Sequence, residues 1–326
     1  MAVYTHLGAE DLADLIAAYD VGELLSAKGI AEGVSNSNWM LETTAGRFIL
    51  PMYERRIDLA DLPFFLGLLD HLAAKGCPVP RTIHDREGAA FRMLGGKAVA
   101  LIEFLPGVSV DRPTAGQARS VGAVLARMHL AATDMAGGRH NALGPDTSAQ
   151  VLAGCGAEAL AGIDPGLPRA IGLGAEVAAR WPAGLPRSVI HSDLFPDNVL
   201  MLGSEVTGLI DFYFACTDMM AYDLAVTHAA WSFTSGGARH RADVGRALLE
   251  GYESIRPLGP AEREALPLLA QGACLRFVSS RSQDWLDTPP EALVTRKDPM
   301  DFLRRLDFYR DAGAAPFAEP VRTSAG

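Results

Sequence analysis

Apolar residues recur along this chain with two different spacings, and the change from one to the other divides the sequence. In the first third, short runs of β-branched, aromatic and other apolar residues are separated by turn residues such as Ala45-Gly46. This arrangement is typical of β-strands. We therefore predict strands at 30–34, 39–42, 47–52, 89–94 and 98–104 and, far downstream, at 199–202 and 206–210.

Helical spacing, with apolar residues three and four positions apart, occurs twice in the first third and dominates after it. The segments 9–19 and 61–76 carry this pattern, and Asp61 with Pro63 is typical of a helix start. Residues 134–160 are rich in Gly, Ala and Pro and show no clear period. In the remainder, helices are predicted at 115–131, 223–231, 242–252, 262–279 and 300–309.

The break between the two regions falls at Leu105-Pro106-Gly107. At 326 residues the chain is too long for one small core and fits two lobes. We predict an α+β fold with a small β-rich N-lobe at residues 1–104, a short hinge, and a larger α-helical C-lobe within residues 105–326.

Composition narrows the class of protein. The formal net charge of -10 argues against nucleic acid as a partner, because phosphate binding depends on positive surface. No apolar run approaches the roughly 20 residues that a membrane-spanning helix needs, and the first residues do not resemble a signal peptide. The four cysteines lie far apart without metal-ligand spacing, which favours buried thiols in the cytoplasm. A monomer and a homodimer are both compatible with these features.

The strongest functional signal is the spacing H-x-D-x-x-x-x-N, formed by His191, Asp193 and Asn198. Two predicted strands follow it, and the second ends at Asp211, where kinases place their main magnesium ligand. The pattern predicts a kinase that transfers the γ-phosphoryl group of ATP to a hydroxyl. An ordinary turn rich in polar caps is the alternative.

Phosphoryl transfer explains the residue types at these positions. Asp193 can orient an attacking hydroxyl and take its proton. Mg²⁺ is a hard cation that prefers oxygen ligands, which Asn198 and Asp211 can supply from opposite sides of a short hairpin. A histidine such as His191 more often holds a loop by packing and hydrogen bonding than carries a proton, and we expect that role here.

Two weaker signals concern the nucleotide. The segment 29–38 is rich in Gly, Ser and Asn and lies between predicted strands, where nucleotide kinases fold a loop over the phosphates; any hairpin turn is the alternative. Glu103-Phe104-Leu105 lies at the lobe junction, where Glu103 and Leu105 are expected to offer backbone groups to adenine. A plain inter-lobe linker is compatible with that role.

Several segments resemble the aminoglycoside-phosphotransferase-like kinases, a family with a bilobal protein-kinase-like fold that phosphorylates small alcohols. The resemblance runs from Val3 to about Phe308, and the catalytic-loop motif belongs to the whole family. The stretches FPDN, IDFYFACTD and TPP..LVT.KDP are similar to the homoserine kinases of this family. The resemblance implies ATP and Mg²⁺ as cofactors, L-homoserine as the small-molecule substrate, and a place in threonine biosynthesis.

Carried over residue by residue, the resemblance makes Asp193 the catalytic base and Asn198 and Asp211 the metal ligands. It adds Gly33 and Asn36 to the phosphate loop and makes Asp223 the buried acid that supports the catalytic loop.

One position departs from the family pattern. Kinases usually place Lys or Arg on the third strand to hold the α- and β-phosphates, and the matching residue here is Pro51. A proline carries no charge and suits an edge strand or a bulge. Arg55, Arg56 and Lys28 are candidates for the replacement cation, and the sequence does not choose among them. The missing cation keeps a nucleotide-binding pseudokinase as an alternative.

A carboxylate such as that of homoserine is best held by arginine. Arg276 and Arg281 lie on a predicted helix of the large lobe, with Trp285 after them, and are candidates for the substrate site; a solvated helix face is the alternative. Asp218 is a candidate for the ammonium group. Choline, methylthioribose and aminoglycosides are alternative acceptors, although a choline site needs an aromatic cage and the chain has only four Trp and seven Tyr.

Overall fold

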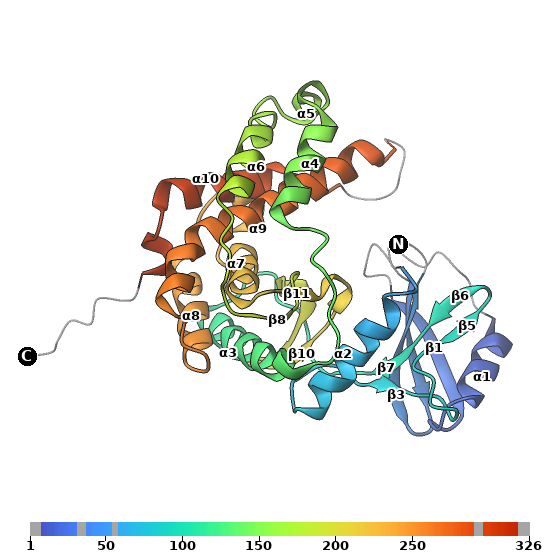
Figure 1. The fold of residues 1–326 in the computed structure, drawn as a ribbon. Helices are drawn as coiled ribbons and strands as arrows, with labels where there is room; N and C mark the ends of the chain where they lie inside the picture. Colours follow the sequence, from blue (N-terminus) through green and yellow to red (C-terminus); the bar gives the residue numbers. More distant parts are fainter. Residues whose placement is uncertain (1–7, 31–36, 54–57, 290–295, 319–326) are drawn as a thin grey trace, which may run out of the picture.

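Two lobes of different composition make up the structure, a computed structural model that describes residues 8–30, 37–53, 58–289 and 296–318. The small lobe is an antiparallel sheet accompanied by two helices, and the large lobe is mostly helical (Figure 1). The predicted α+β fold, with a β-rich N-lobe and a larger α-helical C-lobe, is confirmed.

Among the described residues, the sheet of the small lobe has seven strands. They are β1 (Leu24–Ile30), β2 (Ser37–Thr43), β3 (Gly46–Tyr53), β4 (Thr82–Ile83), β5 (Arg92–Leu94), β6 (Lys97–Val99) and β7 (Leu101–Glu103). All pairs are antiparallel, in the order β1-β2-β3-β6-β5, with β7 beside β3 and β4. The predicted strands at 39–42 and 47–52 lie within β2 and β3. Most of the strand predicted at 30–34 lies outside the described residues.

The two helices of the small lobe cover opposite faces of this sheet. Helix α1 (Ala9–Ala17) packs against Leu50 and Met52 of β3, and helix α2 (Leu62–Ala74) packs against the next residue, Tyr53. This is the alternation that a strand imposes on successive side chains. Other residues of α2 belong to the main core of the large lobe, so this helix lies between the sheet and the large lobe (Figure 1).

Pro51 lies in an interior strand of the sheet. Strand β3 pairs with β2 on one side, and on the other side with β7 before Pro51 and with β6 after it. The Pro51 carbonyl accepts a hydrogen bond of 3.2 Å from the amide of Ala100, the residue that separates β6 from β7. Pro51 therefore occupies an irregularity between two partner strands, where its missing N–H interrupts no regular ladder. Of the two positions that the sequence suggested, an edge strand or a bulge, the edge is wrong.

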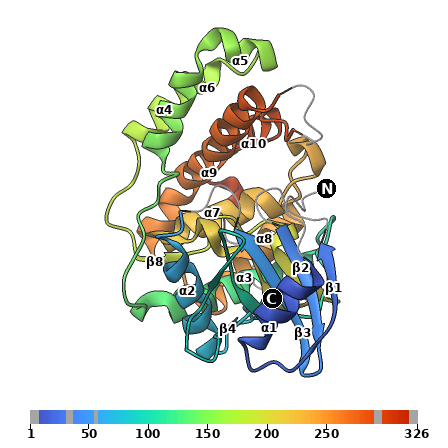
Figure 2. The ribbon, with the colours of Figure 1, turned by 90° about the vertical axis from the view of Figure 1, so that its right-hand side faces the viewer.

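Eight helices are described in the large lobe. They are α3 (Ala115–Ala131), α4 (Pro145–Cys155), α5 (Ala157–Ile163), α6 (Arg169–Ala179), α7 (Met220–Trp231), α8 (Ala242–Glu253), α9 (Pro260–Asp287) and α10 (Met300–Ala312). The predicted helices correspond to α3, α7, α8, α9 and α10, with α9 extending well beyond the predicted end. Helices α4, α5 and α6 lie at the end of this lobe farthest from the small-lobe sheet (Figure 2).

Helices α4, α5 and α6 have no counterpart among the predicted elements, because Ala and Gly make their apolar faces weak in the sequence. The same small residues allow close packing. A Cβ added at Gly174 of α6 would lie 3.2 Å from the Cα of Ala149 in α4. The Ala and Gly residues of these helices therefore hide the helical pattern in the sequence and also allow α4 and α6 to pack closely.

Two short two-stranded sheets lie between α6 and α7. One pairs β8 (Arg187–Ile190) with β11 (Cys216–Met219), and the other pairs β9 (Val199–Leu202) with β10 (Glu205–Leu209). The second pair matches the hairpin predicted from the sequence. Together these strands carry the segments at 191–198 and 210–215.

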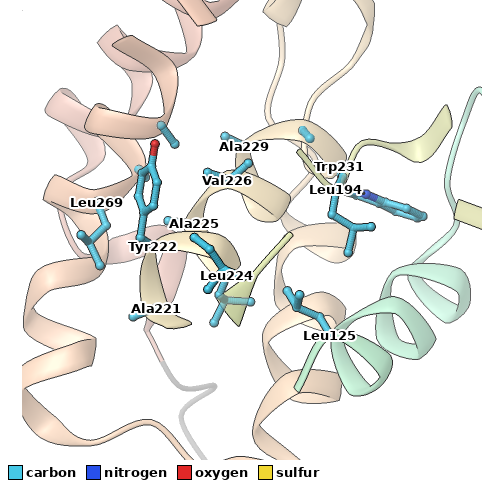
Figure 3. Close-up of a cluster of buried hydrophobic side chains, with 14 of the residues drawn as sticks. Leu125, Leu194, Ala221, Tyr222, Leu224, Ala225, Val226, Ala229, Trp231 and Leu269 are labelled. Atoms are coloured by element: carbon cyan, nitrogen blue, oxygen red, sulfur yellow. Dashed lines mark hydrogen bonds between the residues drawn. The ribbon is translucent and has the colours of Figure 1, made fainter. Parts of the chain in front are cut away.

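Helix α7 is the centre of the large lobe, and every one of its residues is buried. Figure 3 shows Leu224 and Trp231 of α7 among side chains from neighbouring elements, including Leu125 of α3 and Leu194 of the loop after β8. Most of its residues are apolar, and its polar residues Asp223, Thr227 and His228 are hydrogen-bonded inside the lobe. The indole N–H of Trp231 donates to the carbonyl of Leu194 at 3.0 Å, so α7 also anchors that loop.

Within the part of the chain that the structure describes, no helix is long and apolar enough to cross a membrane. All four cysteines fall in that part, and each is a free thiol.

Helices α3 and α8 approach each other closely through two glycines. A Cβ added at Gly122 of α3 would overlap the carbonyl oxygen of Leu248, and one added at Gly251 of α8 would overlap the carbonyl oxygen of Arg119. In both cases the overlapping atom belongs to the backbone of the other helix, and backbone atoms cannot change rotamer to make room as side-chain atoms can.

We expect Gly122→Ala to lower the free energy of unfolding by about 1–3 kcal/mol, because the added methyl group must separate the two helices. The matched control is Gly172→Ala on α6, where nothing lies within 4 Å of the added Cβ. Removing a helical glycine there should raise stability by up to about 1 kcal/mol. Urea denaturation of both variants measures the difference, and equal effects would contradict the packing described.

Candidate active site

The candidate active site lies on the loop between β8 and β9 and on the segment after β10. Two of its residues, Ser192 and Asp211, have left-handed backbone conformations, with φ of 67° and 65°. In the described chain they are the non-glycine residues with positive φ. Such backbone conformations cost energy and cluster at functional sites, which points to this region independently of the motif.

Asp223 of α7 holds the start of the loop. One of its carboxylate oxygens accepts hydrogen bonds from the amide of His191 at 2.8 Å and from Nε2 of His129 at 2.9 Å. The other accepts from the amide of Ser192 at 2.7 Å. Burial by itself raises the pKa of Asp223, but the hydrogen bonds and charges of His129 and His191 together outweigh it and lower the pKa. The expected role of Asp223 as the buried acid under the loop is confirmed.

His191 links the loop to the segment that carries Asp211. The side chain is fully buried, its Nδ1 accepts from the amide of Asp193 at 3.2 Å, and its Nε2 donates to the carbonyl of Ile210 at 2.9 Å. Burial lowers the pKa of His191, so the neutral ring is favoured. With both nitrogens engaged, His191 holds the loop and is not placed to carry a proton, as predicted.

The carboxylate of Asp193 lies in a largely enclosed position between two side chains. Its side chain is 17% exposed, with Oδ1 3.4 Å from Nη2 of Arg276 and Oδ2 3.4 Å from Nδ2 of Asn198. Burial raises the pKa of Asp193, and the charge of Arg276 opposes this effect. A raised pKa makes this carboxylate a better proton acceptor than a solvent-exposed aspartate.

Asn198 and Asp211 meet across the hairpin. The carbonyl of Asn198 accepts from the amide of Ile210 at 3.0 Å, which brings Asp211 next to the loop. Asn198 uses its amide nitrogen to donate to the carbonyl of Asp193 at 2.8 Å, so its side-chain oxygen is directed elsewhere. Desolvation by the surrounding protein and the charges of Asp193 and Asp197 raise the pKa of Asp211 to about 7.

These donors fit a magnesium ion that is shared with a nucleotide. In the described residues, no three His, Cys, Asp or Glu side chains gather to hold a metal by themselves. Mg²⁺ does not need such a cage, because it is usually bound by one or two protein oxygens together with phosphates and waters. Desolvation contributes most to the raised pKa of Asp211, and the charges of Asp193 and Asp197, which a cation would offset, add to it.

Most of the residues predicted to contact the phosphates of ATP cannot be placed relative to the site. Gly33 and Asn36 of the predicted phosphate loop, and the candidate cations Arg55 and Arg56, lie outside the described residues. The third candidate, Lys28, is exposed on β1.

Lys297 was missed by sequence reasoning, although it stands in the KDP segment. Its charge lowers the pKa of both Asp193 and Asp211. Its side chain is exposed. The residues before and after Lys297 are anchored, because Arg296 donates to the carbonyl of Thr288 and the carbonyl of Asp298 accepts from Arg281.

The linker between the lobes is fixed to the β9–β10 hairpin. Leu105 packs on Gly208, where a Cβ would lie 2.8 Å from a Leu105 methyl carbon. Val108 and Met201 exchange two backbone hydrogen bonds of 3.1 and 3.0 Å. Glu103, at the end of β7, accepts from Nε of Arg81 at 3.2 Å. Glu103 and Leu105, the two predicted hinge residues, therefore lie on a connection that is bonded to the hairpin before Asp211.

Arg276 of α9 is brought into the site, but its guanidinium faces the catalytic loop. The residue is 2% exposed. Its Nη1 donates to the carbonyl and to the hydroxyl oxygen of Ser192, and its Nη2 approaches Asp193.

The other substrate candidates are Arg281 and Trp285, which contact the connection between α9 and α10, and Asp218, which lies on β11. Nη1 of Arg281 donates to the carbonyl of Asp298 at 2.9 Å and lies 3.3 Å from a carboxylate oxygen of Asp301. The guanidinium of Arg296 lies over the ring of Trp285, 5.4 Å from its centroid. Asp218, considered for the ammonium group, is buried on β11 and already bonded to polar side chains.

Comparison with known proteins agrees with this geometry. Residues 26–258 match the model of the phosphotransferase enzyme family. The chain is 51% identical over 316 residues to the homoserine kinase of Acidiphilium cryptum (strain JF-5), covering 97% of this chain and 98% of that protein. It is 48% identical over 324 residues to the homoserine kinase of Hyphomonas neptunium (strain ATCC 15444), with coverage of 97% and 98%.

Solved structures show the same fold at low sequence identity. The amicoumacin kinase hAmiN, in complex with AMP-PNP, Ca²⁺ and Ami, has a TM-score of 0.68 and 13% identity, covering 95% of this chain and 94% of that one. A microcompartment-associated aminopropanol kinase has a TM-score of 0.67 and 18% identity, covering 95% and 98%. This likeness establishes the bilobal protein-kinase-like fold.

We expect Asp223→Asn to lower kcat more than about tenfold. The side-chain NH2 group of asparagine cannot accept a hydrogen bond, so at least one N–H donor of the loop loses its partner and Asp193 moves from its position. Stability should also fall, by about 1–3 kcal/mol for each buried donor left without a partner. Steady-state turnover and thermal denaturation measure the two effects.

Asp85→Asn is the matched control. Asp85 is a buried acid of the small lobe that accepts from the amides of Ala89 and Glu87 at 2.8 and 3.0 Å. Its replacement should lower stability but leave kcat unchanged at temperatures where the protein is folded. If both variants lost activity only in proportion to stability, Asp223 would have no specific role in the loop.

Proposed function

The chain belongs to the phosphotransferase enzyme family, and on this premise we propose that it is the kinase that phosphorylates L-homoserine with ATP, giving O-phospho-L-homoserine and ADP. The observation that carries the proposal is the similarity to homoserine kinases over nearly the whole length of both chains. This reaction places the chain in threonine biosynthesis. The arrangement of Asp193, Asn198 and Asp211 supports the proposal.

In the proposed reaction, Asp193 orients the homoserine hydroxyl and accepts its proton as the oxygen attacks the γ-phosphorus. The bond from the γ-phosphorus to the bridging oxygen of ATP breaks, and ADP leaves with that oxygen. Catalysis of this kind consists mainly of positioning and charge stabilisation. Asn198 and Asp211 would hold Mg²⁺, which supplies positive charge to the phosphates when bound.

The residues that we assign to nucleotide binding lie in the small lobe and at the junction between the lobes. We assign Gly33 and Asn36 to the phosphate loop and the backbone of Glu103 and Leu105 to adenine recognition, with the lobe boundary at 104/105. For the cation that Pro51 cannot supply, Lys297 joins the earlier candidates, because its charge acts on both acids of the site.

The proposal also covers the cellular location, the oligomeric state and the partners of the enzyme. We place the enzyme in the cytoplasm as a monomer or homodimer, without a nucleic-acid or membrane partner. The four free cysteines and the negative net charge support this assignment.

Asp193→Asn should lower kcat by about 10²-fold or more, because base catalysis is typically worth 10²–10⁴. Binding of Mg·ATP should remain nearly intact, since Asn198 and Asp211 are unchanged. A coupled assay and calorimetry measure the two quantities. Glu205→Gln, which removes the same charge from an exposed side chain of the β9–β10 hairpin, is the control and should retain kcat within about threefold. Near-normal turnover by Asp193→Asn would remove this residue from the mechanism.

L-Homoserine should be phosphorylated far faster than choline or 3-amino-1-propanol, which is homoserine without its carboxylate. A site built to bind a charged group discriminates strongly against the analogue that lacks it, so we expect a difference in kcat/KM of at least about 100-fold. The comparison requires only initial rates at several concentrations of each alcohol. Equal rates on homoserine and 3-amino-1-propanol would refute the substrate while leaving the kinase activity intact.

A further inference from the structure

Ser192, the residue before Asp193, needs support from its surroundings because its backbone is left-handed. A side chain other than glycine, asparagine or aspartate rarely adopts this conformation without compensating contacts. Asp223 supplies one contact through the Ser192 amide. The carbonyl and the hydroxyl of Ser192 face the other way, where Arg276 meets both of them.

Arg276 reaches Ser192 from α9, 84 residues further along the chain. Its Nη1 lies 2.9 Å from the Ser192 hydroxyl oxygen and also donates to the Ser192 carbonyl. Its Nη2 lies 3.4 Å from Oδ1 of Asp193. The guanidinium carbon lies 5.2 and 4.8 Å from the ring centroids of Phe214 and Phe277, and this aromatic packing limits the movement of the group.

We propose that Arg276 is a positioning residue for catalysis, which fixes Ser192 and thereby sets the orientation of the Asp193 carboxylate. The inference rests on the proposed function, in which Asp193 takes the proton of the acceptor hydroxyl. Arg276 approaches Oδ1 of this carboxylate and Asn198 approaches Oδ2, each at 3.4 Å.

The chemistry of the guanidinium explains why an arginine stands here. Its planar fork places donors in fixed directions, so that one group spans the two oxygens of Ser192 and the carboxylate of Asp193. A lysine ammonium keeps the charge but cannot span all three acceptors from a single point. The charge of Arg276 is buried, and Asp193 is the acid with which it forms an ion pair.

The same observations bear on the earlier expectation that Arg276 binds the substrate carboxylate. Both terminal nitrogens already approach acceptors of the protein, and only 2% of the residue surface is exposed. A carboxylate ligand needs donors that face the substrate. Loss of the positioning contact should therefore affect the rate of the chemical step, whereas loss of a substrate contact should affect KM.

Arg276→Lys is the decisive variant, with Arg276→Gln as its uncharged counterpart. We expect Arg276→Lys to lower kcat by about 10–100-fold, because a displacement of about 1 Å at a catalytic group has effects of this size. The KM values for ATP and homoserine should stay within about twofold. The factor lost from kcat should be the same with 3-amino-1-propanol as acceptor, since the contact does not involve the substrate carboxylate.

Epistasis with the catalytic acid separates positioning from general damage. If Arg276 acts through Asp193, adding Arg276→Lys to Asp193→Asn should change the remaining rate by less than about threefold, because residues that act as a unit are not additive. An undiminished loss in the double variant would overturn the inference. So would an unchanged kcat in Arg276→Lys, or a rise in the KM for homoserine alone, which would return Arg276 to the substrate carboxylate.

Arg305→Lys is the matched control. Arg305 of α10 is also buried, at 8% exposure, packs over Phe302, and donates from Nη1 to the carbonyl of Ala229 at 2.7 Å. Its replacement should cost comparable stability and leave kcat unchanged. If Arg276→Lys does not fold, Ser192→Gly tests part of the same contact, because glycine accepts the left-handed backbone and removes the hydroxymethyl side chain while the carbonyl that Arg276 contacts remains. That variant should lose about 3–10-fold in kcat at constant KM, and no loss would overturn the inference.

The proposed function and the positioning role fail in different ways. Absence of homoserine phosphorylation by the unaltered chain would refute the proposed substrate, and the Arg276 comparison would then use the alcohol that the chain does phosphorylate. Normal homoserine turnover combined with an unaffected Arg276→Lys would refute the positioning role alone.

Discussion

The buried carboxylate of Asp223 is the interaction on which the active site depends. It accepts the amides of two consecutive loop residues and Nε2 of His129, so it joins three elements of the large lobe at one point. Buried acids are costly unless fully hydrogen-bonded, and this one has three donors. The helix that carries it is buried on all sides, which gives the carboxylate a fixed position from which the loop is built.

From this point the site is assembled by backbone contacts more than by contacts between side chains. His191 ties the loop to Ile210, Asn198 ties its own loop to the same residue, and both bonds bring Asp211 into place. The linker between the lobes is paired with strand β9 of the same hairpin. The parts proposed for adenine recognition, metal binding and proton transfer are therefore all hydrogen-bonded to one short hairpin.

Much of the fold and of the site could be predicted, because the signals involved are local. The long amphipathic helices, the hairpin at β9–β10 and the catalytic-loop spacing each lie within a few turns or strands of contiguous sequence. Prediction was weaker where composition removes contrast, as in the Ala- and Gly-rich helices α4 to α6. It was also incomplete at Pro51, since the break between β6 and β7 that accommodates the proline lies about fifty residues away along the chain.

The sequence by itself determined the chemistry: a carboxylate, an amide and a second carboxylate at the spacing of a phosphoryl-transfer site, on a chain that forms a β-rich and an α-rich lobe. Only the tertiary structure decided which distant side chains serve that site. Arg276 is 84 residues from Ser192, and the sequence offered it together with Arg281 only as a candidate for the substrate carboxylate. Lys297 likewise acquires its place from the packing of the segment before α10. The physical reason is that hydrophobic periodicity specifies which face of a helix is buried, whereas the partner that a buried charge meets depends on how the helices pack.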